Sequence, residues 1–215
     1  MILKRIKVNA GGILGVNCYI VQDENTKETM VIDPGGSLEK IEEMLDTISA
    51  KVKYILLTHC HGDHIGVVNT LREKYGGVVL IHRDDEPGLK SPEINLSEHI
   101  GIGSVIIEDV SRLNDGDIIH VGDLEFKIIH TPGHTCGSIS VYCEEEKLVF
   151  SGDTLFRGSW GRTDLPTSSF SEIIDSITNK LMILPGDTIV YPGHGKSTII
   201  QEEEPIYLEL KPKAY

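Results

Sequence analysis

The sequence has 215 residues, of which 40% are hydrophobic and 25% are charged, ordinary proportions for a globular protein. A chain of this length can bury a full hydrophobic core, and we expect a single domain over residues 1–215. Its 33 acidic and 20 basic residues give a formal charge of −13. Such a surface repels phosphate groups, so nucleic acid and membrane surfaces are poor candidate partners.

No apolar stretch approaches the roughly 18 residues that a membrane span needs. The four cysteines are far apart and form no Cys-x-x-Cys pair, a pattern typical of reduced thiols inside the cell. We therefore expect a cytoplasmic protein. Three acidic runs, at 84–86, 144–146 and 202–204, are expected to form solvated turns and helix ends.

Ten short runs rich in β-branched and aromatic residues predict strands. They cover residues 2–8, 18–22, 28–32, 54–57, 78–82, 117–121, 124–129, 139–143, 147–150 and 188–191. Helical spacing of apolar residues predicts three helices, over 38–48, 65–75 and 173–184. Ser37 is the expected N-cap of the first helix, and Ser169 with Glu172 is spaced as a capping box before the third.

This alternation of strands and helices predicts two packed β-sheets flanked by helices, an α/β (α+β) architecture. The stretch 88–104 is rich in Ser, Pro and Asn and has little periodicity. It is either a mobile flap near a site or a long surface connection, and we expect the connection.

The segment 58–64 places His59, His61, Asp63 and His64 directly after an apolar run. Neutral imidazole and carboxylate groups are ligands that zinc and iron accept. His59 and His61 are two residues apart and can point toward one ion, while Asp63 and His64 can turn toward a second. A solvated loop rich in histidine is the alternative, but such crowding is costly without a cation.

Four ligands cannot complete two metal shells, so further ligands must come from other segments. His134, Asp153 and His194 each follow a predicted strand, where a side chain can be presented at a sheet edge. Small residues beside them allow sharp turns and a close approach of the chain. These three residues are therefore the expected remaining ligands.

In this order, His-x-His-x-Asp-His, Gly-His-Thr, Gly-Asp and Gly-His resemble the motifs of the metallo-β-lactamase superfamily over nearly the whole chain. The resemblance implies a four-layer αββα sandwich with two mixed sheets and a binuclear site at one sheet edge. The implied ligands are His59, His61 and His134 for one metal, Asp63, His64 and His194 for the second, and Asp153 bridging both.

An aspartate at the bridging position is similar to glyoxalase II-like hydrolases, whereas true metallo-β-lactamases usually have Cys or Ser there. The sequence Asp-Thr-Leu-Phe at 153–156 and the pair Gly161-Arg162 strengthen this likeness. Glyoxalase II proteins continue into a helical region that helps to bind glutathione, and the residues after His194 are too few for that unit.

Two residues are candidates for holding a metal ligand in place by a hydrogen bond, as metal sites usually require. His130 lies four residues before His134, and Asp33 lies in the sequence Val-Ile-Asp-Pro-Gly at 31–35. The alternatives, a core histidine with satisfied hydrogen bonds and a turn or capping aspartate, stay open.

Arg162 and Lys196 are the candidate substrate contacts. They either hold a substrate carboxylate or pair with Asp164 and nearby acids, and the sequence leaves both interpretations open. Where Asp164 and Lys196 stand, the glyoxalase II family usually has tyrosines. The single tryptophan, Trp160, is a substrate-stacking surface, an interface anchor or part of ordinary packing.

The expected function is a binuclear metal-dependent hydrolase that cleaves a small thioester of the S-lactoylglutathione type. A hydroxide bridging the two metals would attack the carbonyl, and Asp63 and Asp153 are the expected catalytic carboxylates because they balance the charge of the cations. Two divalent ions are expected, with zinc first and iron or manganese compatible. The sequence carries no signal for an oligomeric state.

Two alternatives come from other classes. A persulfide dioxygenase shares the fold and a Gly-Arg-Thr-Asp stretch like 161–164, and would hold one iron through His59, His134 and Asp153. It would consume oxygen, whereas a hydrolase would not. A non-catalytic metal-binding protein is the third possibility, because a site does not by itself imply an activity.

Overall fold

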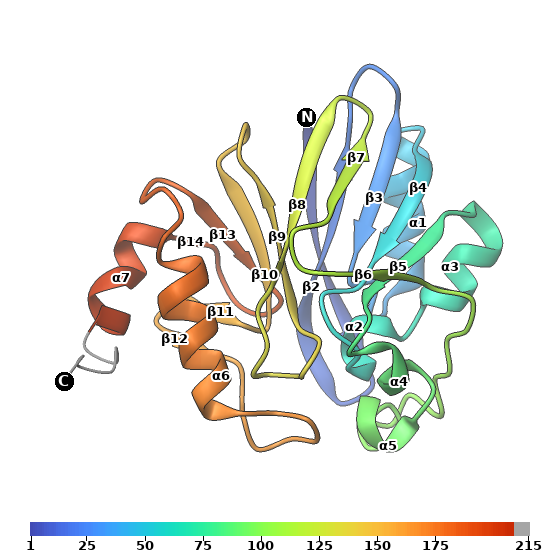
Figure 1. Cartoon of the computed structure of the whole chain (residues 1–215). Helices are drawn as coiled ribbons and strands as arrows, with labels where there is room; N and C mark the ends of the chain where they lie inside the picture. Colours follow the sequence, from blue (N-terminus) through green and yellow to red (C-terminus); the bar gives the residue numbers. More distant parts are fainter. Residues whose placement is uncertain (209–215) are drawn as a thin grey trace.

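The computed structural model describes residues 1–208, which form two β-sheets packed face to face between helices (Figure 1). The first sheet has the order β1-β2-β3-β4-β5-β6. Its strands are β1 (Ile2–Ala10), β2 (Ile13–Gln22), β3 (Glu28–Ile32), β4 (Lys51–Leu56), β5 (Val78–His82) and β6 (Ser111–Leu113). The second sheet has the order β14-β13-β10-β9-β8-β7. Its strands are β14 (Thr198–Ile199), β13 (Ile189–Pro192), β10 (Leu148–Gly152), β9 (Ile139–Cys143), β8 (Leu124–His130) and β7 (Ile118–Val121).

Both sheets are mixed. In the first sheet, β3, β4, β5 and β6 are parallel, and β1 and β2 add in antiparallel fashion. In the second sheet, β10 and β13 are parallel, and the other pairs are antiparallel. The carboxyl ends of parallel neighbours lie at the same edge of a sheet, which is where open α/β sheets commonly bind ligands.

The central core lies between the two sheets. Tyr19 and Met30 of the first sheet are in the same buried cluster as Phe126 and Phe150 of the second, and each is at most 2% exposed. Along β8, buried and exposed residues alternate, as a strand with one face on a core requires. The apolar faces of the two sheets therefore fix their relative position.

Helices cover the outer faces of the sheets. On the first sheet, α1 (Leu38–Thr47) and α3 (Val68–Tyr75) bury Leu45 and Leu71. On the second, α6 (Phe170–Asp175), the π-helical η1 (Ser176–Leu181) and α7 (Ile200–Leu208) form a cluster with Val149 and Val190. These layers confirm the predicted αββα sandwich, which Figure 1 shows edge-on.

The ten predicted strands are all present, with ends that shift by a few residues. The strands that the sequence did not indicate are very short: β6, β14, and the hairpin of β11 (Leu155–Phe156) and β12 (Ser159–Trp160). Two or three residues are too few to show an alternating pattern. The helix α7 also lacked a helical pattern, because Pro205 lies inside it.

Several local predictions about helices were wrong. Ser37 does not cap α1; it has a left-handed backbone, and its hydroxyl accepts a hydrogen bond from Asn9 N. The helix predicted at 65–75 begins later, as α3 at Val68, and the short α2 (Gly62–Ile65) lies before it. By contrast, the Ser169 hydroxyl accepts from Glu172 N and caps α6, as expected.

The stretch 88–104 is more than a surface connection. The short helix α4 (Glu86–Leu89) runs into its start, and the short helix α5 (Pro92–Asn95) lies within it. Leu89, Asn95 and Ser97 of this stretch are completely buried. A side chain at Gly88 would collide with the sulfur of Cys60. The segment therefore packs directly against the histidine-rich loop.

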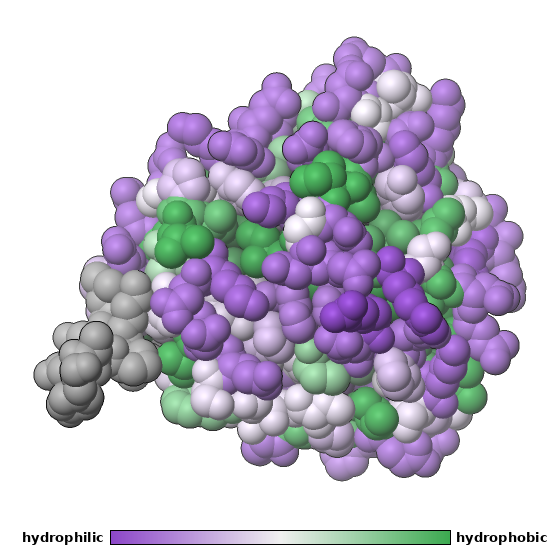
Figure 2. All heavy atoms as spheres, in the orientation of Figure 1, coloured by the Kyte–Doolittle hydropathy of each residue, from purple (hydrophilic) through white to green (hydrophobic). Residues whose placement is uncertain are grey.

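The face of the molecule in Figure 2 is mostly hydrophilic, with separate hydrophobic patches. All four cysteines are free, and three of them are buried. Within residues 1–208, no helix has the length and apolar character that crossing a membrane would require.

Candidate metal centre

The seven candidate ligands converge at one edge of the two sheets, at the bottom of Figure 1 near α2. They come from four segments that each follow a strand. The loop after β4 carries His59 and His61 and leads into α2, the turn after β8 carries His134, and β10 and β13 end just before Asp153 and His194. The parallel pairing of β10 with β13 places Asp153 and His194 at the same sheet edge.

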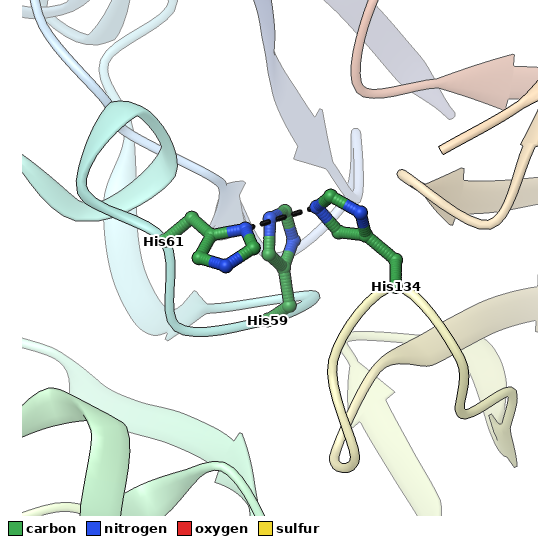
Figure 3. A group of neighbouring side chains, drawn as sticks. All are labelled: His59, His61 and His134. Atoms are coloured by element: carbon green, nitrogen blue, oxygen red, sulfur yellow. Dashed lines mark hydrogen bonds between the residues drawn. The ribbon is translucent and has the colours of Figure 1, made fainter. Parts of the chain in front are cut away.

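His59, His61 and His134 form the first ligand group. Their rings stand nearly perpendicular to one another, at 76° to 88° (Figure 3). His61 Nδ1 and His134 Nε2 are 2.9 Å apart, and the buried His59 Nε2 has no hydrogen-bond partner among the described residues. The possible ligand nitrogens of the three rings lie within 4.8 Å of one another, close enough to bind one ion.

Asp63, His64 and His194 form the second ligand group. His194 Nε2 lies 3.3 Å from Asp63 Oδ2 and 3.3 Å from His64 Nε2, and His64 Nε2 lies 3.7 Å from Asp63 Oδ2. Ligands about 2.1 Å from a tetrahedral zinc ion are about 3.4 Å from each other. The spacing of this group therefore fits a cation at its centre.

Asp153 lies between the two groups. Its Oδ2 is 3.6 Å from His134 Nε2 and 3.5 Å from His194 Nε2, while its Oδ1 is 3.5 Å from His64 Nε2. This buried Oδ1 has no hydrogen-bond partner in the described chain. A buried carboxylate oxygen without a donor is costly, and a cation at this point would remove that cost. A side chain at Gly193 would collide with Asp153, so glycine allows the close approach.

The electrostatics of the two groups differ. Burial, followed by the positive charge of neighbouring histidines, lowers the pKa of His59 and His61 well below the ordinary value. Burial also lowers the pKa of His64, but the carboxylates of Asp63 and Asp153 outweigh it and raise this pKa to about 10. The second group thus holds a proton that a divalent cation would replace.

The carboxylate of Asp63 has the opposite shift. Burial raises its pKa, but the charges of His64 and His194 outweigh burial and hold the pKa well below the usual range. Asp63 is therefore an anion at neutral pH, the form in which it can bind a cation.

Asp33 is placed against the second group. Its Oδ2 lies 2.9 Å from His64 Nδ1 and accepts from the Thr58 hydroxyl, and its Oδ1 accepts from Thr58 N. This contact leaves His64 Nε2 directed at Asp63, Asp153 and His194. Of the two candidates for holding a ligand in place, Asp33 is therefore the one that contacts an expected ligand.

His130 lies elsewhere. Its ring stacks on His82, with centroids 4.0 Å apart, and its Nε2 lies 2.8 Å from Cys136 O. None of the hydrogen bonds that it makes within residues 1–208 reaches one of the seven ligands. The expected contact from His130 to His134 is therefore absent from the described residues. His130 instead packs against His82, where β5 and β8 end.

Asp85 is a residue that the sequence did not indicate, because the acidic run 84–86 was expected to be solvated. It is only 2% exposed. Its carboxylate accepts from Cys60 N at 2.9 Å, from the Thr135 hydroxyl at 2.7 Å and from Gly137 N at 2.7 Å. One side chain thus joins the loop of His59 and His61 to the turn of His134. The available signal was its place just after a strand that ends at the same sheet edge.

A second contact that the sequence did not indicate involves the main chain. His134 Nδ1 lies 2.9 Å from Arg162 O, which turns Nε2 toward the first group. A side chain at Gly161 would collide with Asp153 O, so this approach depends on glycine. The pair Gly161-Arg162 therefore supports His134 through its backbone.

A pocket of about 760 Å³ opens onto the centre and is lined by Asp63, His134, Asp153 and His194. Arg162 also lines it, but its guanidinium bonds both oxygens of Asp164, at 2.7 and 2.8 Å. Lys196 is outside the lining. Of the two candidate substrate contacts, only Arg162 is therefore at the pocket, and it is paired with an acid.

Comparison with known proteins gives consistent matches. A model of the metallo-beta-lactamase superfamily matches residues 11–194. Hydroxyacylglutathione hydrolase GloC of Haemophilus influenzae is 33% identical over 190 residues, covering 87% of this chain and 89% of that protein.

Solved structures give the same result. The B3 metallo-beta-lactamase BLEG-1 is similar with a TM-score of 0.88 at 33% identity, covering 98% of this chain and 100% of that one. A protein called TTHA1623, solved in a di-iron-bound form, has a TM-score of 0.81 at 35% identity, covering 92% and 96%. Since the family match includes all seven convergent side chains, this chain belongs to the metallo-beta-lactamase superfamily.

Proposed function

We propose that this protein is a hydrolase that binds two divalent cations, one at each ligand group, with Asp153 as the bridging ligand. The observation that carries the proposal is the place of Asp153, whose Oδ2 is nearly equidistant from His134 Nε2 and His194 Nε2. Imidazole and carboxylate ligands suit zinc first, and iron or manganese as well. The likeness to a di-iron-bound protein keeps iron among the candidates.

Bound cations at these groups would lower the pKa of a water molecule to about 7 and polarise a substrate carbonyl. The residues of the chain prepare the site for this. Burial keeps the rings of His59 and His61 neutral, and Asp33 keeps the second ring nitrogen of His64 directed at the centre. The negative charges of Asp63 and Asp153 would offset part of the charge of the two cations. The remaining positive charge would attract a carbonyl oxygen.

The proposal extends to a thioester substrate of the hydroxyacyl-thiol type. The likeness to a hydroxyacylglutathione hydrolase supports this class. A thiol has a pKa near 8.5, so a thiolate leaves with little help from a proton donor. No serine or cysteine nucleophile is required, and Cys60 and Cys136 belong to neither ligand group.

Oxidation at a single iron would require only His59, His134 and Asp153. The second group would then have no role, although Asp33 holds His64 in place and Gly193 admits Asp153 between both groups. Those features favour two cations, and hydrolysis over oxygenation. The ligands follow β4 of the first sheet and β8, β10 and β13 of the second, which supports one functional domain built from both sheets.

The test combines metal analysis with an assay on small thioesters, S-lactoylglutathione and an acyl-N-acetylcysteamine, followed with an oxygen electrode. We expect about two metal ions per chain, release of free thiol and no oxygen uptake. If the protein instead held one iron per chain and consumed dissolved oxygen when glutathione persulfide was added, it would be a dioxygenase. Two metals without turnover of any thioester, lactone or phosphodiester would indicate a non-catalytic protein.

A further inference from the structure

The part of the pocket beyond the metal centre has an apolar wall built by separate segments. Ile13 comes from the start of β2, Leu96 and Ile100 follow α5, and Phe156 and Trp160 lie on the β11–β12 hairpin. All five are half-buried, so part of each side chain remains free in the pocket. Each of these surfaces lies within one cavity of about 760 Å³ that also contains the metal ligands.

Charged groups are scarce on this wall. Among the pocket-lining residues of the described chain, Arg162 is the single lysine or arginine, and it forms a two-bond pair with Asp164. A charged carrier such as glutathione has two carboxylates that would need cationic partners. The overall charge of −13 works against such a carrier as well.

The wall is held in a definite shape. Leu96 has φ 62° and ψ 14°, a left-handed conformation that normally favours glycine or asparagine at a helix end. Gly12 N donates to Ile100 O at 2.9 Å, and a side chain at Gly11 would collide with the same oxygen. The segment that contains Leu96 and Ile100 is thus fixed to the turn before β2. Leu96 itself lies in a backbone conformation that is strained for leucine.

The hairpin side of the wall is held by α7. Glu203, which is 2% exposed although it lies in an acidic run, accepts from Gly158 N at 2.8 Å. The Tyr207 hydroxyl donates to Ser159 O at 2.8 Å, and the rings of Tyr207 and Trp160 lie 6.0 Å apart. The last described helix therefore braces the surface that carries Phe156 and Trp160.

From this arrangement we propose that the pocket recognises an apolar group attached to the thioester, so that substrates are selected by hydrophobic contact rather than by paired charges. This inference rests on the hydrolase function proposed above and narrows its substrate class. The reaction is hydrolysis: the carbon–sulfur bond of the thioester breaks, water supplies the oxygen of the carboxylate, and the thiol leaves. Each methylene group of the substrate that is buried against the apolar wall should raise kcat/KM about fourfold.

The test uses the full-length, metal-loaded protein and two series of thioesters. One series lengthens the acyl chain from acetyl to hexanoyl on neutral N-acetylcysteamine, and the other lengthens an alkanethiol from ethyl to hexyl under a constant acetyl group. We expect kcat/KM to rise at least about tenfold along one series, and that series identifies the side that the wall contacts. Flat rates along both series, with turnover present, would overturn the inference and leave the hydrolase standing.

A binding measurement separates failure of the inference from failure of the hydrolase. Trp160 is the only tryptophan in the chain and lines the pocket, so its fluorescence reports occupancy. If no thioester is cleaved, the thioesterase part of the proposed function fails. A titration with S-hexyl- and S-methyl-N-acetylcysteamine then decides the inference, which requires the hexyl thioether to bind at least about tenfold more tightly.

Variants locate the contact. Ile100→Ala should remove most of the chain-length preference, whereas the matched control Ile183→Ala, at a residue 72% exposed and outside this pocket, should leave it intact. Leu96→Gly should also flatten the preference without loss of folding, because glycine adopts this backbone readily. An unchanged preference in both Ile100→Ala and Leu96→Gly would contradict the inference.

Discussion

The two ligand groups are built differently. In the first, all three histidines are at most 3% exposed, and Asp85 fixes the two loops that carry them through backbone and hydroxyl contacts. In the second, the side chain of His194 is 28% exposed and that of Asp63 is 15% exposed, and Asp33 contacts His64 directly. The first group therefore depends on the placement of loops, and the second depends on the orientation of one ring.

This difference has a functional meaning. The second group faces the pocket more openly, while the first is enclosed and its residues His59 and His61 are neutral. Asp153 lies within 3.6 Å of ligands from both groups, so its loss should affect both.

Asp153→Ala should give the largest effect. Both cations would lose a ligand at once, so kcat/KM should fall by more than about 100-fold, beyond the loss typical for residues that merely support ligands. Metal content should fall in the same variant, as measured by mass spectrometry of the purified protein. Asp164→Ala is the matched control, because its carboxylate is exposed and pairs with Arg162. Full activity in Asp153→Ala would contradict the bridging role.

Asp33→Asn and Asp85→Asn should separate the groups. Asp33→Asn should weaken binding of one metal equivalent by about 10- to 100-fold, because it disturbs the orientation of His64. Competition with a chromophoric chelator measures this affinity.

Asp85→Asn should instead lower the unfolding free energy of the metal-free protein by about 1–3 kcal/mol, because a buried acceptor of two N–H groups and a hydroxyl is impaired. Denaturant unfolding checks this value. If the two variants gave the same profile of metal affinity and stability, the proposed difference between the groups would be wrong.

Metal removal should destabilise the protein by mass action. Metal at 100 times its dissociation constant stabilises a fold by about 2.7 kcal/mol per site. For a chain of this size, the chelated protein should therefore melt roughly 5–10 °C lower for each site emptied. Calorimetry with and without chelator measures the shift, and an unchanged melting temperature would argue against cations in these groups.

The smallest effect is the release of a proton. In the metal-free protein, His64 has a pKa raised to about 10, whereas His59 and His61 are neutral. At pH 8, binding of metal at the second group should release at least one proton, because burial is outweighed by Asp153 and Asp63 and the pKa of His194 is raised as well. His59 and His61 are already in the neutral form that binds metal. Titration calorimetry in buffers of different ionisation enthalpy counts the protons.

The same shift fixes the pH dependence of stability for the metal-free protein. A raised pKa means that the contribution of the His64 charge is full below about pH 6.5, the unfolded value, and is lost as the pH rises toward 10. The metal-free protein should thus lose stability on the alkaline side. Constant stability from pH 6 to 10 would contradict the charged state of His64.

Much of the centre could be predicted from the sequence because its chemistry is local. His59, His61, Asp63 and His64 occur within one short segment, and His134, Asp153 and His194 each follow a strand beside glycine or another small residue. The runs of β-branched and aromatic residues were also long enough to predict the ten main strands.

The supporting contacts could not be predicted, because they depend on long-range packing. Asp85 and Glu203 lie in acidic runs that are typical of solvent-exposed chain, and only the folded structure buries them. The apolar wall likewise unites Ile13, Leu96 and Trp160, which are far apart in the sequence. No periodic pattern marks such a surface, because each segment contributes only one or two side chains.

The most direct test of the account is a crystal structure of the metal-loaded protein with anomalous scattering data. We expect two metal peaks on either side of Asp153, one about 2.1 Å from His59 Nε2 and the other about 2.1 Å from His64 Nε2. A single peak held by His59, His134 and Asp153, with the second group empty at saturating metal, would contradict the binuclear centre.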